Sequence, residues 1–297
     1  MELGYACINE TLRPDGISTN RTMRKKTFIE KGINYAAELG LQNTADLLPI
    51  LEFNVKNKIQ VFRMSSNFYP WVGEYKLKEL PTYERIKTLL AGCGYYAERN
   101  NIRITSHPGP FNVLVSPNKD VVKRTYTDLE VHGEIFDLMG LSKTPYNKIN
   151  IHCNGVYGDK KAAMDRFCKN FEGLSESVKS RLTVENDDKP AMYSVKDLMY
   201  IHERIGIPIV FDYHHHKFCT GGLSEQEALE LALSTWPKDI KPIVHYSESK
   251  ALHENNSKIK PQAHSDLINK LPNLYGNDVD IMVEAKGKEL AILPFIK

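Results

Sequence analysis

The sequence predicts an α/β fold, a single TIM-type (β/α)8 barrel over residues 1–297, on two observations. Eight short runs of β-branched or apolar residues recur along the chain, and helix-like stretches alternate with them throughout. This alternation is typical of a parallel sheet whose strands are connected by helices. In addition, no Pro/Gly/Ser-rich linker, low-complexity tract or single-signed block of charge marks a domain boundary. An open doubly wound sheet is the alternative that the same alternation allows.

The expected elements follow one another in regular order. The strands cover residues 2–8, 59–65, 102–106, 148–153, 181–186, 208–213, 241–246 and 278–285. The helices cover residues 22–39, 82–100, 119–140, 160–172, 194–204, 224–234 and 261–270. Ser194 and Ser224 are the expected N-caps of two of them. In the helix 224–234, leucines and alanines supply apolar positions while three glutamates can stay in water, as expected of a helix on the outer ring.

Composition limits the classes of protein that the chain can represent. It is 41% hydrophobic and 26% charged, and 39 basic against 37 acidic residues give a net charge of +2. The whole-molecule charge therefore does not indicate a nucleic-acid binder, and any basic surface must be local. The five cysteines form no CxxC pair, which favours reduced thiols and an intracellular protein, cytoplasmic or nuclear according to its source. Neither a signal peptide nor a membrane span is expected.

Potential metal ligands follow six consecutive strands of the predicted barrel. Barrel enzymes carry their catalytic residues at the carboxyl ends of the strands, where side chains from different strands converge. From the third strand to the eighth, these positions hold His107, His152, Glu185, Asp212 with His214, His215 and His216, His245, and Glu284. Imidazole and carboxylate together suit zinc, manganese or iron, and carboxylates can bridge neighbouring ions. The pattern predicts a site for two or three cations.

Each of these residues also has a structural interpretation. A single histidine at a strand end more often has a structural or surface role than a metal-binding one, and it is the repetition that favours a site. Glu185 and Glu284 follow apolar runs, where a carboxylate needs a cation or hydrogen bonds, and a salt bridge is the alternative. His132, His202 and His253 lie away from strand ends and are interpreted as solvent-facing or hydrogen-bonded. The absence of a G-x-S-x-G elbow disfavours a covalent hydrolase.

Several long motifs resemble those of the UV damage endonuclease family, in order and over almost the whole chain. They are LGYACIN (3–9), FRMSSNFYP (62–70), HPGPF (107–111), IHCNGVYGDK (151–160), LTVENDD (182–188), VFDYHHH (210–216), HYS (245–247), HSD (264–266) and DIMVEAKGKE (280–289). The resemblance implies a barrel akin to endonuclease IV and xylose isomerase. It also implies up to three divalent ions, most commonly Mn²⁺ with Zn²⁺ or Mg²⁺ as alternatives, and incision of damaged double-stranded DNA 5′ to ultraviolet photoproducts, both cyclobutane dimers and 6-4 products.

The resemblance also assigns roles to individual residues. Matched by position, the metal ligands are His107, His152, Glu185, Asp212, His215, His245, His264 and Glu284, with Glu74 as a further ligand where the family often has a histidine. Of these, Glu185, Asp212, His245 and Glu284 are the expected catalytic residues. His264 is expected early in the helix 261–270, and His214 and His216 are expected to support the site or face DNA. Tyr5 and Asn9 are expected near the lesion.

Two departures from the family pattern concern DNA and metal binding. Where the family usually has glutamine and an aromatic residue after HPG, this chain has Pro110 and Phe111; Phe111 can still wedge into DNA, but Pro110 cannot donate a side-chain hydrogen bond. A lysine common two residues before the seventh-strand histidine is here Ile243. Arg63, Lys160 and Lys286 are candidate phosphate contacts.

The mechanism expected is attack on the phosphorus by a metal-activated hydroxide, with the photoproduct flipped out of the duplex by a monomeric enzyme. Tyr5 and Phe111 are the expected stacking residues. Two other functions stay open. A metal-dependent sugar isomerase or epimerase uses similar ligands on the same fold, and a lesion-binding protein could keep the site without activity.

Overall fold

Eight parallel strands form the centre of the computed structural model, which describes residues 1–296. They are β1 (Leu3–Ala6), β2 (Val61–Met64), β3 (Arg103–Ser106), β4 (Ile149–His152), β5 (Leu182–Glu185), β6 (Ile209–Val210), β7 (Ile243–Tyr246) and β8 (Asp280–Val283). Their order is β6-β5-β4-β3-β2-β1-β8-β7, and a parallel bridge between Asp212 and His245 joins the two outer strands. The predicted barrel is therefore confirmed, and the open doubly wound sheet is wrong.

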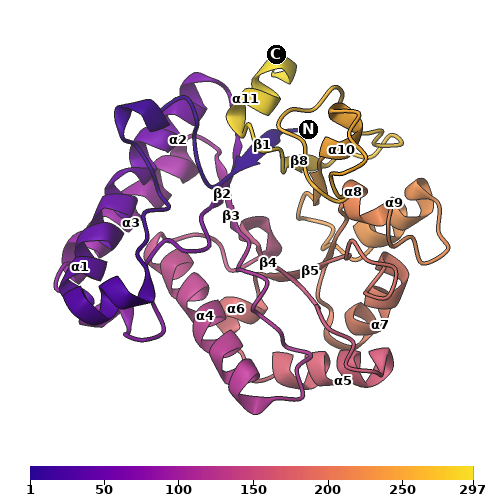
Figure 1. Ribbon diagram of the computed structural model, residues 1–297, viewed down its shortest axis with the longest axis horizontal. Coiled ribbons are helices and arrows are strands. Elements are labelled where there is room, and N and C mark those ends of the chain that lie inside the picture. Colours follow the sequence, from indigo (N-terminus) through magenta and orange to yellow (C-terminus); the bar gives the residue numbers. More distant parts are fainter. Residues whose placement is uncertain (297) are drawn as a thin grey trace.

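Helices surround this barrel, as Figure 1 shows. The longer ones are α1 (Lys25–Ala45), α2 (Leu47–Lys56), α3 (Tyr83–Arg99), α4 (Lys119–Leu138), α5 (Lys160–Phe171), α7 (Val195–Ile205) and α9 (Glu225–Leu233). The short ones are α6 (Glu176–Lys179), α8 (Tyr213–His216), α10 (Lys250–His253), α11 (Glu289–Ile292), and the 3-10 turns η1 (Arg13–Asp15), η2 (Leu77–Glu79), η3 (Pro145–Asn147) and η4 (Leu293–Phe295). Ser194 and Ser224 cap α7 and α9 as predicted, each in a capping box.

The helix predicted over 261–270 does not form, because the backbone there bonds to other segments. His264 makes an antiparallel bridge with Ser249, and the Ser265 amide donates to the Glu248 carbonyl. The carbonyl of Ser265 accepts from the Lys286 amide at 2.9 Å, and that of Asp266 accepts from the Gly287 amide at 2.7 Å. A helix needs these same groups for its own ladder. His264 consequently lies in an irregular segment held against the loop after β8.

The barrel interior is polar on one side and apolar on the other. Along each strand, every second side chain points inward. From β6 round to β2, buried Ala6, Val61, Val210, Ile243 and Met282 form a small apolar cluster that Trp236 joins. On the side of β3 to β5, the interior holds a bonded Asn150–Thr183 pair, and an ion pair of 3.1 Å joins Arg103 of β3 to Asp280 of β8. The larger hydrophobic core lies between the sheet and the surrounding helices.

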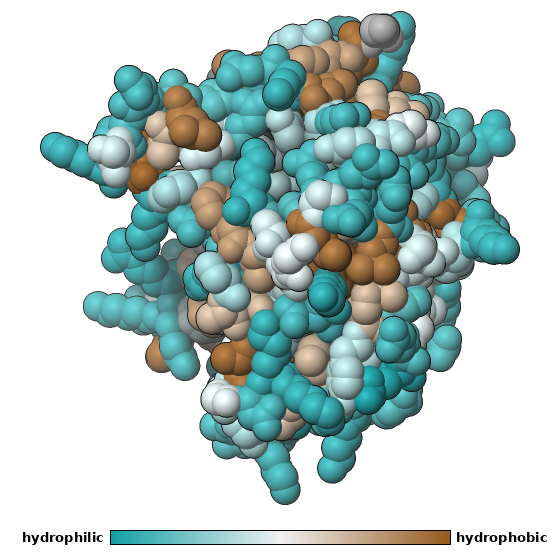
Figure 2. Space-filling model, turned by 90° about the vertical axis from the view of Figure 1, so that its right-hand side faces the viewer, coloured by the Kyte–Doolittle hydropathy of each residue, from teal (hydrophilic) through white to brown (hydrophobic). Residues whose placement is uncertain are grey.

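The outer surface is mostly polar. In Figure 2, polar side chains cover most of one face, and apolar side chains appear between them in small groups. The outer helices thus direct their apolar sides inward, as their sequence predicts. Over residues 1–296, none of the helices combines the length and the apolar character that crossing a membrane requires.

Candidate metal centre

Glu185, the last residue of β5, is the centre of a cluster of histidines and carboxylates. It is fully buried and takes part in three groups whose ligand atoms lie within 4.8 Å of one another. These groups are His107, His152 and Glu185; Glu185, His245 and Glu284; and Glu185, Asp212 and His215. Seven of the predicted ligands thus converge from six strand ends, as expected of residues at the mouth of a barrel.

The two carboxylate oxygens of Glu185 face different sides of the cluster. Its Oε2 lies 3.2 Å from His107 Nε2 and 3.0 Å from His245 Nδ1. Its Oε1 lies 3.3 Å from His215 Nδ1. His245 Nδ1 is in turn 3.1 Å from Glu284 Oε1. A single carboxylate is therefore common to all three groups, which is the arrangement that a bridged set of cations requires.

Several buried atoms of the cluster have no partner in hydrogen-bonding geometry within residues 1–296, although ionisable neighbours lie close to three of them. They are Glu185 Oε1, Asp212 Oδ2, His152 Nδ1 and His245 Nδ1. Buried polar atoms in proteins are nearly always hydrogen-bonded, so four such atoms in one cluster need an explanation. Imidazole nitrogens and carboxylate oxygens are ligands for zinc, manganese and iron. The residues present therefore fit divalent cations.

Local structure explains how the carboxylates and histidines meet. Residues His152 and Glu185 are direct neighbours in the parallel register of β4 and β5. Asp212 follows β6 and is the N-cap of α8, where its Oδ1 accepts a hydrogen bond from the His215 amide at 2.7 Å. This cap starts a helical turn immediately after the strand, and the turn brings His215 back over Glu185. The choice of His215 among the three adjacent histidines is consistent with this geometry.

His214 and His216 point away from this cluster and are buried. His214 Nε2 lies 3.1 Å from the Gln262 carbonyl oxygen, and the His216 ring centre is 5.3 Å from that of Phe211. Both side chains are buried. The expectation that they face DNA is therefore wrong, because α8 turns them into the protein interior.

The charges of the cluster affect one another strongly. Burial alone would raise the pKa of Glu185, but His245 and His152 outweigh it and hold that pKa well below its usual value. Burial lowers the pKa of His107 to about 4. Burial also opposes the charge of His152, yet Glu185 and Asp187 raise its pKa to about 8. Glu185 is thus ionised in the folded chain, and its carboxylate attracts positive charge.

Three residues that sequence reasoning missed support this cluster. Lys148 is fully buried, and its Nζ lies 2.9 Å from His245 Nε2. Asn150 donates to Glu185 Oε2, and Asp187 Oδ1 lies 3.2 Å from His152 Nδ1. Lys148 and Asn150 precede His152 by four and two residues and thus share its face of β4. This alternation along the strand is the sequence signal from which Lys148 and Asn150 could have been predicted to lie near the site. Ile243, where the family often has lysine, instead packs in the inner apolar cluster.

Two predicted ligands lie outside the three groups. His264 Nδ1 is 2.9 Å from the Glu284 carbonyl oxygen, and its ring centre is 6.3 Å from that of His215, so it lies at the edge of the cluster. Glu74 is exposed and lines a cavity between η2 and α4. The structure does not bring Glu74 to the cluster, because the turn that contains Gly73 lies against α4, beside Thr127.

The predicted DNA-contacting residues fall into two sets. Tyr5 and Asn9 are fully buried: the Tyr5 hydroxyl donates to Asn54 at 2.8 Å and accepts from Asn9 at 2.9 Å. Neither side chain reaches the surface, so the stacking role expected of Tyr5 is wrong, while the placement of both residues near the lesion stays a prediction. Pro110 and Phe111 are exposed beyond the end of β3, and the Phe111 side chain is 87% exposed. That position suits a side chain that enters DNA.

The three side chains predicted to contact phosphate differ in whether they already have a partner within the protein. Arg63 is partly buried and forms an ion pair with Glu284, which raises the Arg63 pKa although burial opposes the charge. Lys160 donates to the Met192 carbonyl and to Asp197 at 3.1 Å. Both cations therefore have partners within the protein, and their contacts to phosphate stay a prediction. Lys286 is exposed next to the end of β8 and keeps that role as a prediction.

The other three histidines have local partners, as interpreted from the sequence. His132 lies 4.0 Å from Asp128, and His202 Nδ1 lies 3.0 Å from the Ile207 carbonyl oxygen. His253 pairs with Glu248.

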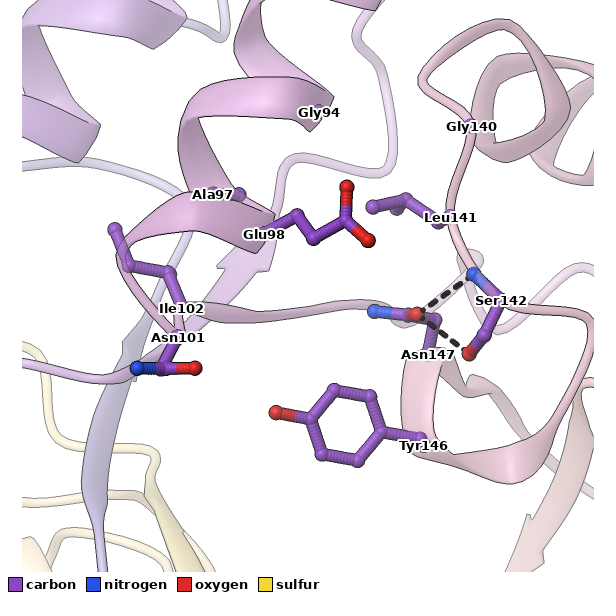
Figure 3. Close-up of a pocket in the computed structure, with 10 residues that line it drawn as sticks. All are labelled: Gly94, Ala97, Glu98, Asn101, Ile102, Gly140, Leu141, Ser142, Tyr146 and Asn147. Atoms are coloured by element: carbon purple, nitrogen blue, oxygen red, sulfur yellow. Dashed lines mark hydrogen bonds between the residues drawn. The ribbon is translucent and has the colours of Figure 1, made fainter.

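A separate cavity of about 260 Å³ lies at the opposite end of the barrel. Its lining in Figure 3 comes from the end of α3 and from the segment before β4. There the Asn147 side-chain oxygen accepts from the amide and the hydroxyl of Ser142 at 3.1 and 2.8 Å. Because none of the candidate ligands lines it, the cavity is not part of the metal centre.

Comparison with known proteins decides the family. The sequence model described as UV-endonuclease UvdE matches residues 1–297. This chain belongs to the UV-endonuclease UvdE family. It is 37% identical over 301 residues to a UV-damage endonuclease of Schizosaccharomyces pombe, covering 98% of this chain and 49% of that protein. It is 33% identical to a UV DNA damage endonuclease of Clostridium perfringens, covering 100% of this chain and 70% of that protein. The chain thus spans about half the length of the first relative.

Solved structures agree with this family. The crystal structure of SacUVDE superposes with a TM-score of 0.86 at 32% identity, covering 100% of this chain and 96% of that one. A D-psicose 3-epimerase from Clostridium cellulolyticum H10 superposes with a TM-score of 0.54 at 12% identity, covering 81% and 80% of the two chains. The second likeness shows the barrel fold alone. The predicted family is confirmed, and the epimerase alternative is not favoured.

Proposed function

We propose that this chain is a DNA repair endonuclease that incises the backbone 5′ to ultraviolet photoproducts in double-stranded DNA. The observation that carries the proposal is the cluster centred on Glu185 at the mouth of a barrel of the UV-endonuclease family. We further propose that residues 1–297 form one domain that is active as a monomer and acts where the genome is, in the cytoplasm or the nucleus.

The cluster would hold up to three divalent ions, with Mn²⁺ the first choice and Zn²⁺ or Mg²⁺ as alternatives. His107 and His152 would hold one ion, His245 and Glu284 a second, and Asp212 and His215 a third, with Glu185 common to all. His264 is a further candidate at the edge. When bound, such ions lower the pKa of water and polarise a phosphodiester.

The chain's own residues orient the reacting groups. The Asp212 cap fixes His215, the Arg63 ion pair fixes Glu284, and Lys148 contacts the far nitrogen of His245. Glu185, Asp212, His245 and Glu284 are the proposed catalytic residues because three carboxylates meet there and His245 Nδ1 lies within 3.1 Å of two of them, Glu185 and Glu284. Phe111 would fill the gap that a flipped photoproduct leaves in the duplex, since its ring is exposed at the rim.

Selective nicking tests the function. The purified chain should nick ultraviolet-irradiated duplex in Mn²⁺ and leave untreated duplex intact, and Glu185→Ala should reduce nicking at least about 100-fold because it removes a ligand common to three groups. Circular dichroism should show that the variant is folded. Equal nicking of both duplexes, or full activity of the variant, would contradict the proposal. Lesion affinity without incision under several metals would indicate the lesion-binding alternative.

A further inference from the structure

The loop after β4 holds an aromatic side chain in a conformation that aromatic residues rarely adopt. Residues 156–159 form a tight turn in which the Asp159 amide donates to the Val156 carbonyl at 3.1 Å. Tyr157 has φ 50° and Gly158 has φ 79°. For a bulky residue, this left-handed backbone costs free energy and persists only where the surrounding structure imposes it.

Local packing does not account for the Tyr157 conformation. Its side chain is 50% exposed and lies outside the hydrophobic core cluster of the described residues. Its ring lies over Gly155, where an added Cβ would come within 3.1 Å of Tyr157 Cε2. Between residues 1 and 296, no partner accepts or donates a hydrogen bond at its hydroxyl group. The strained residue thus presents a ring to solvent.

The same turn occurs a second time, with a clear structural role. Tyr275 and Gly276 have φ 49° and 80°, and the Asn277 amide donates to the Leu274 carbonyl at 2.9 Å. Here, however, the ring packs against the main core, and the Tyr275 hydroxyl donates to Glu225 at 3.0 Å. Packing against the core and a hydrogen bond therefore offset the strain at Tyr275. The Tyr157 ring lies outside that core, and its hydroxyl has no such bond within residues 1–296.

The Tyr157 loop is joined to the loop that carries Phe111. The Asn154 side chain donates to the Asn112 carbonyl at 3.2 Å. Arg166 on α5 donates from Nε to the Val115 carbonyl at 2.7 Å, and its guanidinium carbon lies 5.7 Å from the centre of the Tyr157 ring. Two exposed aromatic rings thus occupy neighbouring loops at the carboxyl ends of β3 and β4, and an arginine of α5 lies beside one of them.

We infer that Tyr157 is a second DNA-stacking residue, which packs against a base of the damaged duplex next to the position that Phe111 enters. This inference rests on the proposed function and adds a contact that determines how tightly DNA is held. Aromatic rings bind bases in any sequence by stacking, and a neighbouring arginine strengthens such a contact. Only the ring is needed, since the hydroxyl group makes no bond.

A pair of matched substitutions tests the inference. Asn tolerates the left-handed region, so Tyr157→Asn should keep or raise Tm and raise the KM for nicking of irradiated duplex about tenfold. Its kcat and metal content should stay as in the parent chain. Tyr157→Phe should keep the parent KM. Tyr275→Asn, the control in the second turn, should show the opposite pattern: a lower Tm and an unchanged KM.

The outcomes separate this inference from the function on which it rests. A KM for Tyr157→Asn within about twofold of the parent value would overturn the stacking role while incision stands, since a lost stack is worth more than that. A fall in Tm equal to that of Tyr275→Asn would also overturn it, because it would indicate a structural role. Failure of the parent chain to nick irradiated duplex would overturn the proposed function itself.

Discussion

Glu185 shows how one buried residue organises the whole candidate site. It is fully buried, yet its pKa is depressed, because histidines from other strands lie around it. A carboxylate in this position would be costly to bury without cationic partners. Glu185 therefore has two roles: it ends the buried strand β5, and it is common to the three groups of candidate ligands.

The three adjacent histidines after β6 provide a test at single-residue resolution. His215→Ala should lower Mn²⁺ affinity and incision at least about 100-fold, because it removes a ligand from the cluster. His216→Ala should leave incision nearly unchanged and lower the free energy of unfolding by about 1–3 kcal/mol, because it leaves space beside Phe211. Isothermal titration with Mn²⁺, nicking rates and urea unfolding measure the three quantities. Comparable losses of activity in both variants would contradict the assignment.

Lys148 is expected to act on the metal centre through His245. Lys148→Met keeps the apolar stem but removes the group 2.9 Å from His245 Nε2, so metal affinity should fall about 10- to 100-fold, as for other residues that orient a ligand. Arg103→Met is the matched control, because Arg103 is also a cation buried inside the barrel but pairs with Asp280. It should lower stability without changing metal affinity. Equal Mn²⁺ affinity in Lys148→Met and the parent chain would count against the role.

At the scale of elements, short structures at the ends of strands position the ligands. The four-residue helix α8 exists because Asp212 caps it, and the cap places Asp212 and His215 in one group. The start of β5 is held by Arg181, which donates to the Leu141 and Ser142 carbonyls and to Asp137 on α4 at 2.7 Å. This contact joins α4 to the strand that ends in Glu185.

The Arg181–Asp137 pair predicts a dependence of stability on pH. Burial opposes the charge of Asp137, but its bonds to Arg181 and Ser177 hold its pKa below the usual value. A carboxylate whose pKa is lower in the folded state stabilises that state at pH values above its unfolded-state pKa of about 3.9. This stabilisation is lost as the pH falls through the folded-state pKa. Asp137→Asn should therefore lower Tm at pH 7, with a difference that shrinks below about pH 4.

The control for this prediction is another carboxylate at a helix surface. Asp165 on α5 is exposed, pairs with Lys161 and accepts a hydrogen bond from the Tyr200 hydroxyl; Asp165→Asn keeps an acceptor oxygen and should change Tm little at either pH. Thermal unfolding at several pH values gives both comparisons. A Tm difference for Asp137→Asn that persists at pH 3 would contradict the assigned cause.

At the scale of the whole molecule, closure of the barrel assembles the site. The final link is the bridge between Asp212 and His245, two proposed ligands, so the last contact of the sheet lies in the candidate metal centre. The conformation of the barrel and the binding of cations should therefore stabilise each other.

Removal of metal tests this coupling. Mn²⁺ at about one hundred times its Kd should stabilise the fold by about 2.7 kcal/mol for one site and raise Tm by about 5 °C, and a chelator should reverse the shift. Chelation should also abolish incision, and restored Mn²⁺ should return it. Glu185→Ala should show no such shift of Tm. A shift of the same size in that variant would place the stabilising ion elsewhere.

The sequence by itself determined the alternation of strands and helices, the barrel class and most of the potential ligands that stand at the strand ends. These depend on local periodicity, which is set by the neighbours of each residue. Tertiary structure alone decided which of those residues meet: Glu74 lies outside the cluster, Tyr5 is buried, and Lys148 reaches His245 across the barrel. It also left 261–270 without a helix, since distant segments bind that backbone. Such contacts depend on how the sheet closes, and the sequence around each residue does not indicate which distant residue it will contact.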